Sequence, residues 1–510
     1  MLHRFHRFHL LLPFLFLCSI LPAQKTDYRE LIESWREAYH VPGMSVGIIN
    51  KGEIILSEGF GNLEEGKTPK ADRNTLYAIA SNTKAFITAS IATLVDEGKL
   101  KWDDPVKKYL PYFELYDPCV SEMMTIRDLL CHRAGLGTFS GDVIWYRNEM
   151  SAEEVVRHAA EIPQAFQFRN GFGYSNVMYI TAGEVIRSVT GKSWDEYARE
   201  KFLDPLHMNR TVTSTHELDK LRNVATPHHP HDERNEPLDW VEWTNSGAAG
   251  GIISSAEDMI KWMGMQLHHG IMGTDTFFTR NQQLQMWTPH VNYPISDRAR
   301  ELYGGRNFNG YGLGWGTSEY NGKMMVSHTG GYDGMYSAVV LLPTEKIGIV
   351  ILTNTMRSIG TLLAYEIIDK LLGLPQKDWK ERGIRQDLDH MADRAQRIKE
   401  RTDAHVMGTS PSMPASAVAG LYRCPMYGDI RITENNGDLL IDFVQAPGLK
   451  AKLSHWHYDT YQLDWLQKQS WFSFGTVQIQ QDNNHQPASL LFDVPNDDIF
   501  FEEIHAVRVK

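Results

Sequence analysis

The sequence predicts an α/β protein of the α+β kind, with a small all-β domain after it. Strand-like segments stand near both ends of residues 24–375, and mostly helical patterns fill the interval between them. After a charged stretch, the chain turns to short alternating segments. We therefore expect an antiparallel sheet flanked by helices, an inserted helical region, and a cleft where the two meet. The last domain is expected to be barrel-like, with a sandwich as the alternative.

The composition fits a globular protein and argues against a nucleic-acid partner. The 510 residues suffice for more than one domain, and 42% hydrophobic and 22% charged residues are ordinary shares. The net charge of -12 argues against nucleic acid, because binding phosphates needs a basic surface. The oligomeric state is left open.

The first segment resembles an export signal. Two arginines precede an apolar stretch, residues 10–23, that is short for a membrane span and ends in the small residue Ala23. We expect a signal peptide over residues 1–23 and a periplasmic or secreted mature chain; an anchor or a core helix are the alternatives. A lipoprotein at Cys18 is less favoured, because the large Leu17 precedes it.

The first domain, residues 24–375, opens with a helix and a hairpin and closes with a hairpin and a helix. Apolar spacing marks the helices, and Asn50-Lys51-Gly52 suits a hairpin turn. The expected helices are 27–39, 83–97, 125–130, 177–190, 255–268 and 359–372, and the expected strands are 43–49, 53–60, 336–342 and 347–354.

A connector and a second domain follow. Residues 376–414 are highly charged and helix-like, and end in a short Ser/Pro-rich stretch. Residues 415–510 are expected to form the β domain. Its aromatic residues are expected to be core: Trp456, Tyr461, Trp465, Trp471 and Phe472.

The first chemical motif is Ser81-Asn82-Thr83-Lys84, at the start of an expected helix. There the helix dipole favours a developing negative charge on the serine oxygen. Lys84 lies one turn on and on the same face. It can take the proton of Ser81 if a crowded cationic site lowers its pKa.

Two further motifs follow in order. Tyr174-Ser175-Asn176 lies in a glycine-rich turn, where the phenol could shuttle a proton and Asn176 could bind a substrate amide or cap a helix. His328-Thr329-Gly330 precedes a strand, and its small residues let a substrate lie along the sheet edge. The backbone N–H groups of Ser81 and Gly331 would form an oxyanion hole.

In this order the motifs resemble the serine β-lactamase and penicillin-binding protein superfamily, on the class C-like branch that holds D,D-peptidases, D-aminopeptidases and esterases. The similarity covers about residues 27–374, and includes segments 125–136, 249–259 and 311–315. The C-terminal β domain resembles one often appended to such proteins.

The resemblance implies a role for each motif residue. The implied roles are Ser81 as nucleophile, Lys84 as its activating partner, Tyr174 as general acid/base, Asn176 as a ligand of the substrate amide, and His328, Thr329 and Gly330 as the third substrate-binding element. The expected function is an exported serine hydrolase that cleaves an amide or ester through an acyl-enzyme. The expected partner is a small-molecule or peptide substrate, for which D-amino-acid peptides, peptidoglycan fragments, small esters and β-lactams are the candidates, and no cofactor is implied. The alternative is a catalytically weak binding or sensing protein.

The third motif departs from the family pattern, which usually has lysine before Thr-Gly. A histidine with a pKa of about 6.5 is mostly neutral at pH 7. We therefore expect weak, pH-dependent anchoring of a substrate carboxylate by His328, which argues against efficient β-lactam hydrolysis and favours an esterase or peptidase.

Three other patterns are set aside. Ser45 lies in a G-x-S-x-G match, but inside an expected strand rather than at a strand-to-helix turn. The cluster His228, His229, His231 and Asp232 is expected to be a solvated loop and not a metal site. Of three mature cysteines, Cys119, Cys131 and Cys424, the first two could pair, although buried reduced thiols are favoured.

Overall fold

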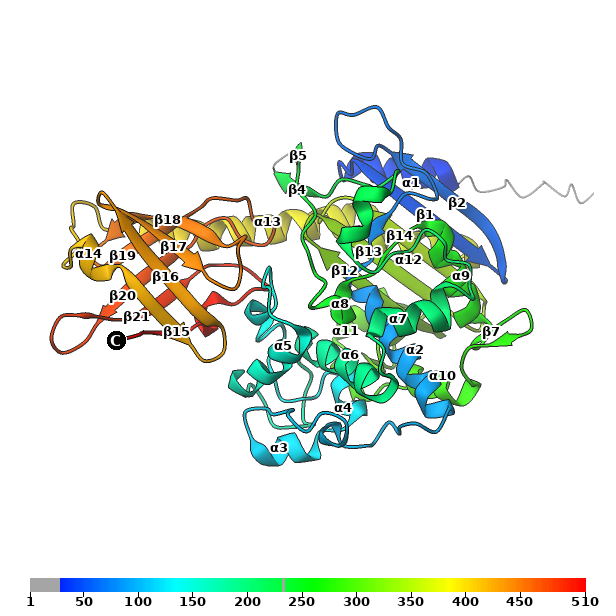
Figure 1. The fold of residues 1–510 in the computed structure, drawn as a ribbon. Coiled ribbons are helices and arrows are strands. Elements are labelled where there is room, and N and C mark those ends of the chain that lie inside the picture. The colour runs from blue at the N-terminus through cyan, green and yellow to red at the C-terminus, as the bar shows by residue number, and fades with distance from the viewer. Residues whose placement is uncertain (1–27, 232–233) are drawn as a thin grey trace, which may run out of the picture.

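The protein is described by a computed structural model over residues 28–231 and 234–510. The predicted signal peptide, the lipoprotein alternative at Cys18, and Asp232 lie outside these residues. Figure 1 shows a larger body, in which helices flank a sheet, and a β-barrel beside it; the long helix α13 joins the two.

The larger body is built on an eight-stranded antiparallel sheet, in the order β2-β1-β14-β13-β12-β11-β10-β9. β1 pairs with β14, with Val46 opposite Ile351, so the two ends of the domain meet inside one sheet as predicted. Both strands are almost wholly buried, because helices cover both faces. The strands are β1 (Gly43–Asn50), β2 (Glu53–Gly61), β9 (Val291–Asn292), β10 (Asn309–Tyr311), β11 (Gly316–Tyr320), β12 (Lys323–Tyr332), β13 (Met335–Leu342) and β14 (Ile347–Thr353).

Helices α1 (Tyr28–Ala38) and α12 (Gly360–Leu372) cover one face of this sheet. Trp35 and Ile367 belong to one buried cluster with Ile349 of the sheet. On the other face, α9 (Ala256–Leu267) packs so closely that a Cβ on Gly47 of β1 would lie 2.6 Å from Ile260. The sheet is therefore the middle layer of three.

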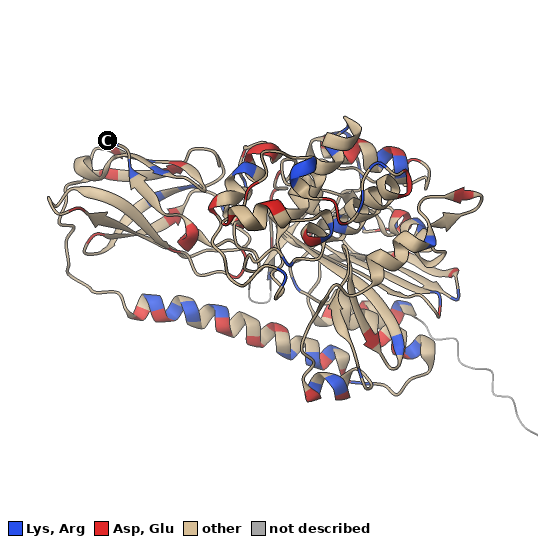
Figure 2. Ribbon diagram, turned by 90° about the horizontal axis from the view of Figure 1, so that it is seen from below, with Lys and Arg blue, Asp and Glu red and all other residues tan. Residues whose placement is uncertain are grey.

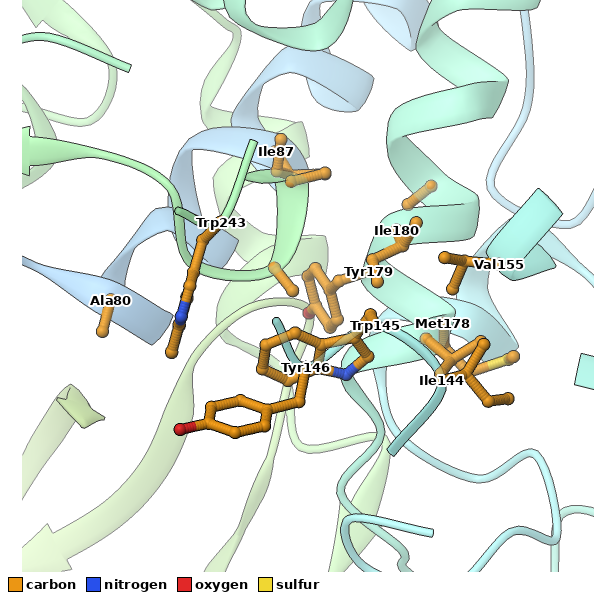
Figure 3. Packing of buried hydrophobic residues seen from close by; sticks show 14 of the residues in the cluster. Ala80, Ile87, Ile144, Trp145, Tyr146, Val155, Met178, Tyr179, Ile180 and Trp243 are labelled. Atoms are coloured by element: carbon orange, nitrogen blue, oxygen red, sulfur yellow. The ribbon is translucent and has the colours of Figure 1, made fainter. Parts of the chain in front are cut away.

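The inserted helical region surrounds α2 (Thr83–Asp96), which is buried on nearly all sides. α6 (Asn176–Thr190) packs beside it, and Figure 3 shows Tyr179 and Ile180 of α6 near Trp145 and Tyr146. The other helices are α3 (Pro118–Met123), α4 (Ile126–Leu130), α5 (Ala152–His158), α7 (Trp194–Ala198), α8 (Gly247–Gly250), α10 (Arg280–Trp287) and α11 (Asp297–Leu302).

The C-terminal domain is a closed antiparallel barrel of the eight strands β15 to β22. Alternate residues point inward, as Ile430 and Ile432 do on β16, so the barrel-like prediction is confirmed. Its strands are β15 (Gly420–Cys424), β16 (Gly428–Asn435), β17 (Asp438–Phe443), β18 (Lys450–His457), β19 (Thr460–Trp465), β20 (Thr476–Gln481), β21 (Pro487–Asp493) and β22 (Ala506–Arg508).

The connector is dominated by α13 (Trp379–Asp403), a helix of 25 residues and therefore about 37 Å long. Figure 2 shows charged residues of both signs along its length. Its first residue, Trp379, is fully buried beside α12, whereas its end reaches the barrel, where Arg401 pairs with Asp493. Over the residues that the structure describes, no helix is both long and apolar enough to cross a membrane.

Two predictions about polar residues are wrong. His228 lies not in a solvated loop but buried in a hairpin strand, where its ring contacts the Asn354 carbonyl at 2.9 Å and accepts from the Glu65 N–H at 3.1 Å. Cys119, Cys131 and Cys424 are free, as favoured, and the last two are buried as expected, but Cys119 is exposed. Ser45 is a buried sheet residue, as expected, and its hydroxyl donates to the Asp72 carbonyl at 2.8 Å.

Candidate active site

Ser81 lies in a tight turn between the short strand β3 (Tyr77–Ala78) and α2. Ala80, just before it, has a φ of +45°, a left-handed conformation that is costly for a residue with a Cβ. Ser337 on β13 holds this turn, because its hydroxyl donates to the Ile79 carbonyl at 2.7 Å and accepts from the Asn82 amide at 2.8 Å. The hydroxyl of Ser81 is thereby held at the start of α2.

Lys84 is fully buried beside Ser81. Its Nζ lies 3.0 Å from Ser81 Oγ, 2.7 Å from Asn176 Oδ1 and 2.7 Å from the Ala249 carbonyl. Burial lowers its pKa to about 7, although the Asp142 carboxyl opposes the shift. A neutral amine has two N–H bonds for Asn176 and Ala249, which directs its lone pair at the Ser81 hydroxyl.

Tyr174 is held against Ser81 and Lys84 by a close backbone approach. A Cβ on Gly173 would lie 1.8 Å from the Leu136 carbonyl oxygen, so only glycine permits this path. The Tyr174 ring centroid is 4.8 Å from Lys84 Nζ. Burial raises the pKa of Tyr174 well above its ordinary value, although a hydrogen bond with Ser81 opposes this, so the phenol is a neutral donor.

Asn176 links the lysine to a buried carboxyl group. It is the first residue of α6, and Ser175 caps that helix instead. Its Oδ1 accepts from Lys84, and its Nδ2 donates to Asp142 Oδ2 at 2.6 Å. Burial raises the pKa of Asp142 to about 8, opposed by hydrogen bonds from Trp145 and Asn176.

The third motif lies within β12 rather than only ahead of a strand. The pairing of β11 with β12 ends at Gly316 opposite Ser327, while the pairing with β13 continues to Tyr332. Residues 328–332 therefore form a local edge of the sheet. A Cβ on Gly330 would lie 2.2 Å from the Ile79 carbonyl oxygen and 2.8 Å from Ser81 N, so glycine lets this edge touch the serine turn.

His328 is held as a neutral ring. Its Nδ1 lies 2.6 Å from the Thr329 carbonyl oxygen and therefore donates, while its Nε2 accepts from the Tyr311 hydroxyl at 2.8 Å. Burial lowers the pKa of His328 to about 3, and Lys84 adds to the shift. The expected pH-dependent charge near neutrality is therefore wrong, because this ring stays uncharged throughout that range.

A cavity of about 340 Å³ opens beside Ser81. It brings together six of the predicted site residues, while Lys84 and Gly330 lie directly behind Ser81. Its lining is Ser81, Phe139, Asp142, Trp145, Tyr174, Asn176, Trp243, His328, Thr329, Gly331, Trp471, Asp498 and Ile499.

Several lining residues carried no signal in the sequence. Asp142 begins a short 3-10 helix (Asp142–Ile144) that Trp145 ends, Trp243 comes from a loop of the helical region, and Asp498 comes from the barrel domain. Trp471 lines this cavity, which corrects its assignment to the barrel core, whereas Tyr461 and Phe472 are buried as expected. A larger cavity of about 570 Å³, at Trp287 and Met324, lies away from these groups and has no serine in its lining.

The comparisons with known proteins agree with this architecture. A family model described as Beta-lactamase matches residues 28–371, and one described as a domain of unknown function (DUF3471) matches residues 404–508.

Two curated proteins illustrate the similarity in sequence. Unguisins hydrolase ungD of Aspergillus violaceofuscus (strain CBS 115571) is 27% identical over 442 residues, which cover 80% of this chain and 76% of that protein. Protein flp of Staphylococcus aureus (strain N315) is 30% identical over 330 residues, which cover 64% of this chain and 62% of that protein.

Two solved structures share the fold. The octameric penicillin-binding protein homologue from Pyrococcus abyssi has a TM-score of 0.61 at 23% identity, and the match covers 94% of this chain and 99% of that one. D-amino acid amidase from Ochrobactrum anthropi SV3, complexed with L-phenylalanine amide, has a TM-score of 0.55 at 24% identity. The match covers 68% of this chain and 98% of that one.

Proposed function

Because the chain belongs to the Beta-lactamase family and is a hydrolase of that family, we propose that it is an exported serine hydrolase that cleaves an amide or ester bond through an acyl-enzyme on Ser81. The contact of Ser81 Oγ with the buried Lys84 Nζ at 3.0 Å carries the proposal. A lysine whose pKa is lowered to about 7 is a base at neutral pH, and this one is adjacent to a hydroxyl nucleophile.

Acylation begins when the neutral Lys84 amine takes the Ser81 proton and Oγ forms a bond to the substrate carbonyl carbon. The carbonyl oxygen becomes an oxyanion and accepts from the backbone N–H groups of Ser81 and Gly331. Tyr174 donates its proton to the leaving group as the C–N or C–O bond breaks, and it regains a proton from the Lys84 ammonium. Water then attacks the acyl-enzyme along the same proton route and frees Ser81.

The candidate substrates are D-amino-acid peptides, peptidoglycan fragments, small esters and β-lactams. The names of the similar proteins include an unguisins hydrolase and a D-amino acid amidase, which supports an amide or ester as the scissile bond. The neutral ring of His328 weighs against any substrate that needs a cation there to hold its carboxylate. β-Lactams are therefore the least favoured of the four.

The test is the intact mass of the protein, quenched shortly after mixing with p-nitrophenyl acetate. We expect an acetyl adduct on the wild type that is missing from Ser81→Ala. The control is Ser45→Ala, at the rival G-x-S-x-G serine, which should keep the adduct. A folded wild type without an adduct would overturn the proposal and favour a binding or sensing protein.

A further inference from the structure

The barrel supplies one wall of the cavity beside Ser81. Asp498 and Ile499 follow β21, and Trp471 lies between β19 and β20. A Cβ on Gly331 would lie 3.3 Å from the Trp471 ring, and Arg394 of α13 donates to the Trp471 carbonyl at 2.8 Å. The barrel wall therefore stands directly opposite the substrate edge of β12.

The acidic side chains of this cavity are two aspartates. Among the residues that the structure describes, its lining contains two carboxyl groups, Asp142 and Asp498, and neither lysine nor arginine. The oxygens of Asp142 already accept hydrogen bonds from Trp145 at 2.8 Å and Asn176 at 2.6 Å. Lys84, behind Ser81, is fully engaged with three oxygens. Asp498 is thus the carboxyl group available to a ligand.

Asp498 lacks a partner within the part of the chain that the structure describes. Its carboxyl group accepts no hydrogen bond there and forms no ion pair, whereas its neighbour Asp497 pairs with Arg397 at 2.7 Å. Burial raises the pKa of Asp498 to about 7; Asp497 adds to the rise and Arg394 opposes it. The raised pKa reflects the free-energy cost of ionising a buried carboxyl group. A cation that entered the cavity would lower this cost, because it stabilises the ionised carboxylate.

Aromatic side chains provide the rest of a cation site. Phe139, Trp145, Trp243 and Trp471 line the same cavity as Asp498. The face of an aromatic ring attracts a cation, most strongly when the site is shielded from water. Rings beside an unpaired carboxylate favour an ammonium group, and the same wall repels a carboxylate.

We propose that Asp498 is a specificity-determining residue, which forms with these aromatic side chains a subsite for a positively charged amino group on the substrate of Ser81. The inference rests on the function proposed above and narrows it to esters or amides that carry an ammonium group near the scissile bond. The β-barrel thereby takes part in substrate selection.

The first experiment compares p-nitrophenyl esters that differ only in charge. Glycine and β-alanine esters are paired with the isosteric propionate and butyrate esters, and kcat/KM is measured for each. The ratio of charged to neutral ester should fall at least about tenfold in Asp498→Asn, because a hydrogen bond to a charged group is lost. The ratio should hold within about twofold in the control Asp497→Asn, which removes an adjacent carboxylate outside the cavity. Comparing ratios cancels the intrinsic reactivity of each ester.

A second measurement does not require turnover. Ser81→Ala protein, with and without Asp498→Asn, is titrated with propylammonium while its tryptophan fluorescence is followed, and propanol serves as the uncharged control. We expect saturable binding of propylammonium that weakens at least about tenfold with Asp498→Asn.

The two measurements separate the two proposals. The subsite would be overturned if the ratio of kcat/KM for charged and neutral esters were the same in the wild type and in Asp498→Asn. It would also be overturned if this ratio fell equally in Asp497→Asn. Either result would leave the hydrolase proposal intact. Inert esters beside propylammonium binding that depends on Asp498 would refute the hydrolase and support the subsite. Propylammonium binding that is unchanged by Asp498→Asn would also overturn the subsite.

Discussion

At the scale of single residues, the chemistry depends on how Lys84 is buried. The side chain lies among Asn176, Ala249 and Ser81, far from bulk water, which removes the preference for the charged form. An exposed lysine with its ordinary pKa would be protonated at neutral pH and could not accept a proton.

The first prediction concerns pH. Below about pH 7 the Lys84 amine is protonated, so kcat/KM for a neutral ester should fall about tenfold per pH unit and should level off above pH 7. The measurement is a pH–rate profile of the wild type beside His328→Gln. Because the pKa of His328 is about 3, the two profiles should share their midpoint; a midpoint that moves with His328 would contradict the assignment.

The second prediction compares two adjacent glycines. A Cβ on Gly330 meets backbone atoms of Ile79 and Ser81 at 2.2 and 2.8 Å, whereas one on Gly331 meets only the Trp471 ring at 3.3 Å. Gly330→Ala should therefore lower the free energy of unfolding by roughly 1–3 kcal/mol and abolish acylation of Ser81. Urea denaturation measures the first effect and ester turnover the second. Equal stability of Gly330→Ala and Gly331→Ala would refute the packing argument.

The contact of Ser81 with Lys84 could be predicted from the sequence, because residues three apart at the start of a helix share a face. The roles of Asp142 and Asp498 could not. Each is a single acidic residue outside the three motifs, and only tertiary packing brings either one to the serine.

At the scale of elements, α4 holds the loops beneath Tyr174. Asp128 is fully buried in its first turn, where it completes a capping box with Thr125. It also pairs with Arg133 at 2.5 Å and with Arg169 at 2.7 Å. One carboxylate therefore joins the helix start to two segments: Arg169 leads into the glycine-rich turn, and Arg133 precedes Leu136, whose carbonyl that turn approaches.

The third prediction is that Asp128→Asn lowers the free energy of unfolding by about 3 kcal/mol, since it leaves two arginines without their buried partner. Asp103→Asn is the matched control. The Asp103 side chain is 69% exposed in its pair with Arg127, so Asp103→Asn should lower the free energy of unfolding by less than about 1 kcal/mol. Denaturant unfolding compares the two, and similar losses would contradict the role of burial.

The fourth prediction concerns the contact between the barrel and the loop that carries Asp142. Glu503 accepts from the Ser140 hydroxyl at 2.5 Å and from the Gly141 N–H at 2.8 Å. Glu503→Ala should release this loop and slow acylation of Ser81 about tenfold, because small displacements in an active site are costly. Stopped-flow acylation measures the effect, with the exposed Glu502→Ala as the control. A similar loss of acylation rate in both variants would show that the contacts of Glu503 with Ser140 and Gly141 are not responsible for it.

Longer elements could be predicted from the sequence better than short ones. The hairpins and the helices at both ends of the domain have sustained apolar patterns, and the structure has them. β9, β10 and β11 have two to five residues each, too few to show a period. Residues 328–331 are small and polar, so their place within β12 had no strand signal of its own.

At the scale of the whole molecule, the barrel and the larger body share a buried core. Tyr146 and Phe472 meet edge to face, with ring centroids 6.2 Å apart. The Glu149 N–H donates to the Gln445 carbonyl at 2.8 Å, and His158 Nδ1 contacts the Pro425 carbonyl at 2.7 Å. Neither body can loosen without exposing part of this joint surface.

The fifth prediction is that the two bodies unfold together. Scanning calorimetry should give one endotherm, because unfolding of the barrel would expose the shared core. The single endotherm of acetylated wild type should lie at a different temperature from that of Ser81→Ala treated with the same ester. Two separate endotherms, of which only one responds to acetylation, would contradict this coupling.

The residues that line the cavity are far apart in the sequence, so they are synthesised at different times. Ser81 leaves the ribosome long before Asp498, and at ordinary rates of synthesis roughly 20–80 s separate them. During that interval the serine and its lysine exist without the carboxylate that stands opposite them in the finished fold. On the mechanism and the subsite proposed above, a nascent chain acquires its nucleophile well before the residue that selects its substrate.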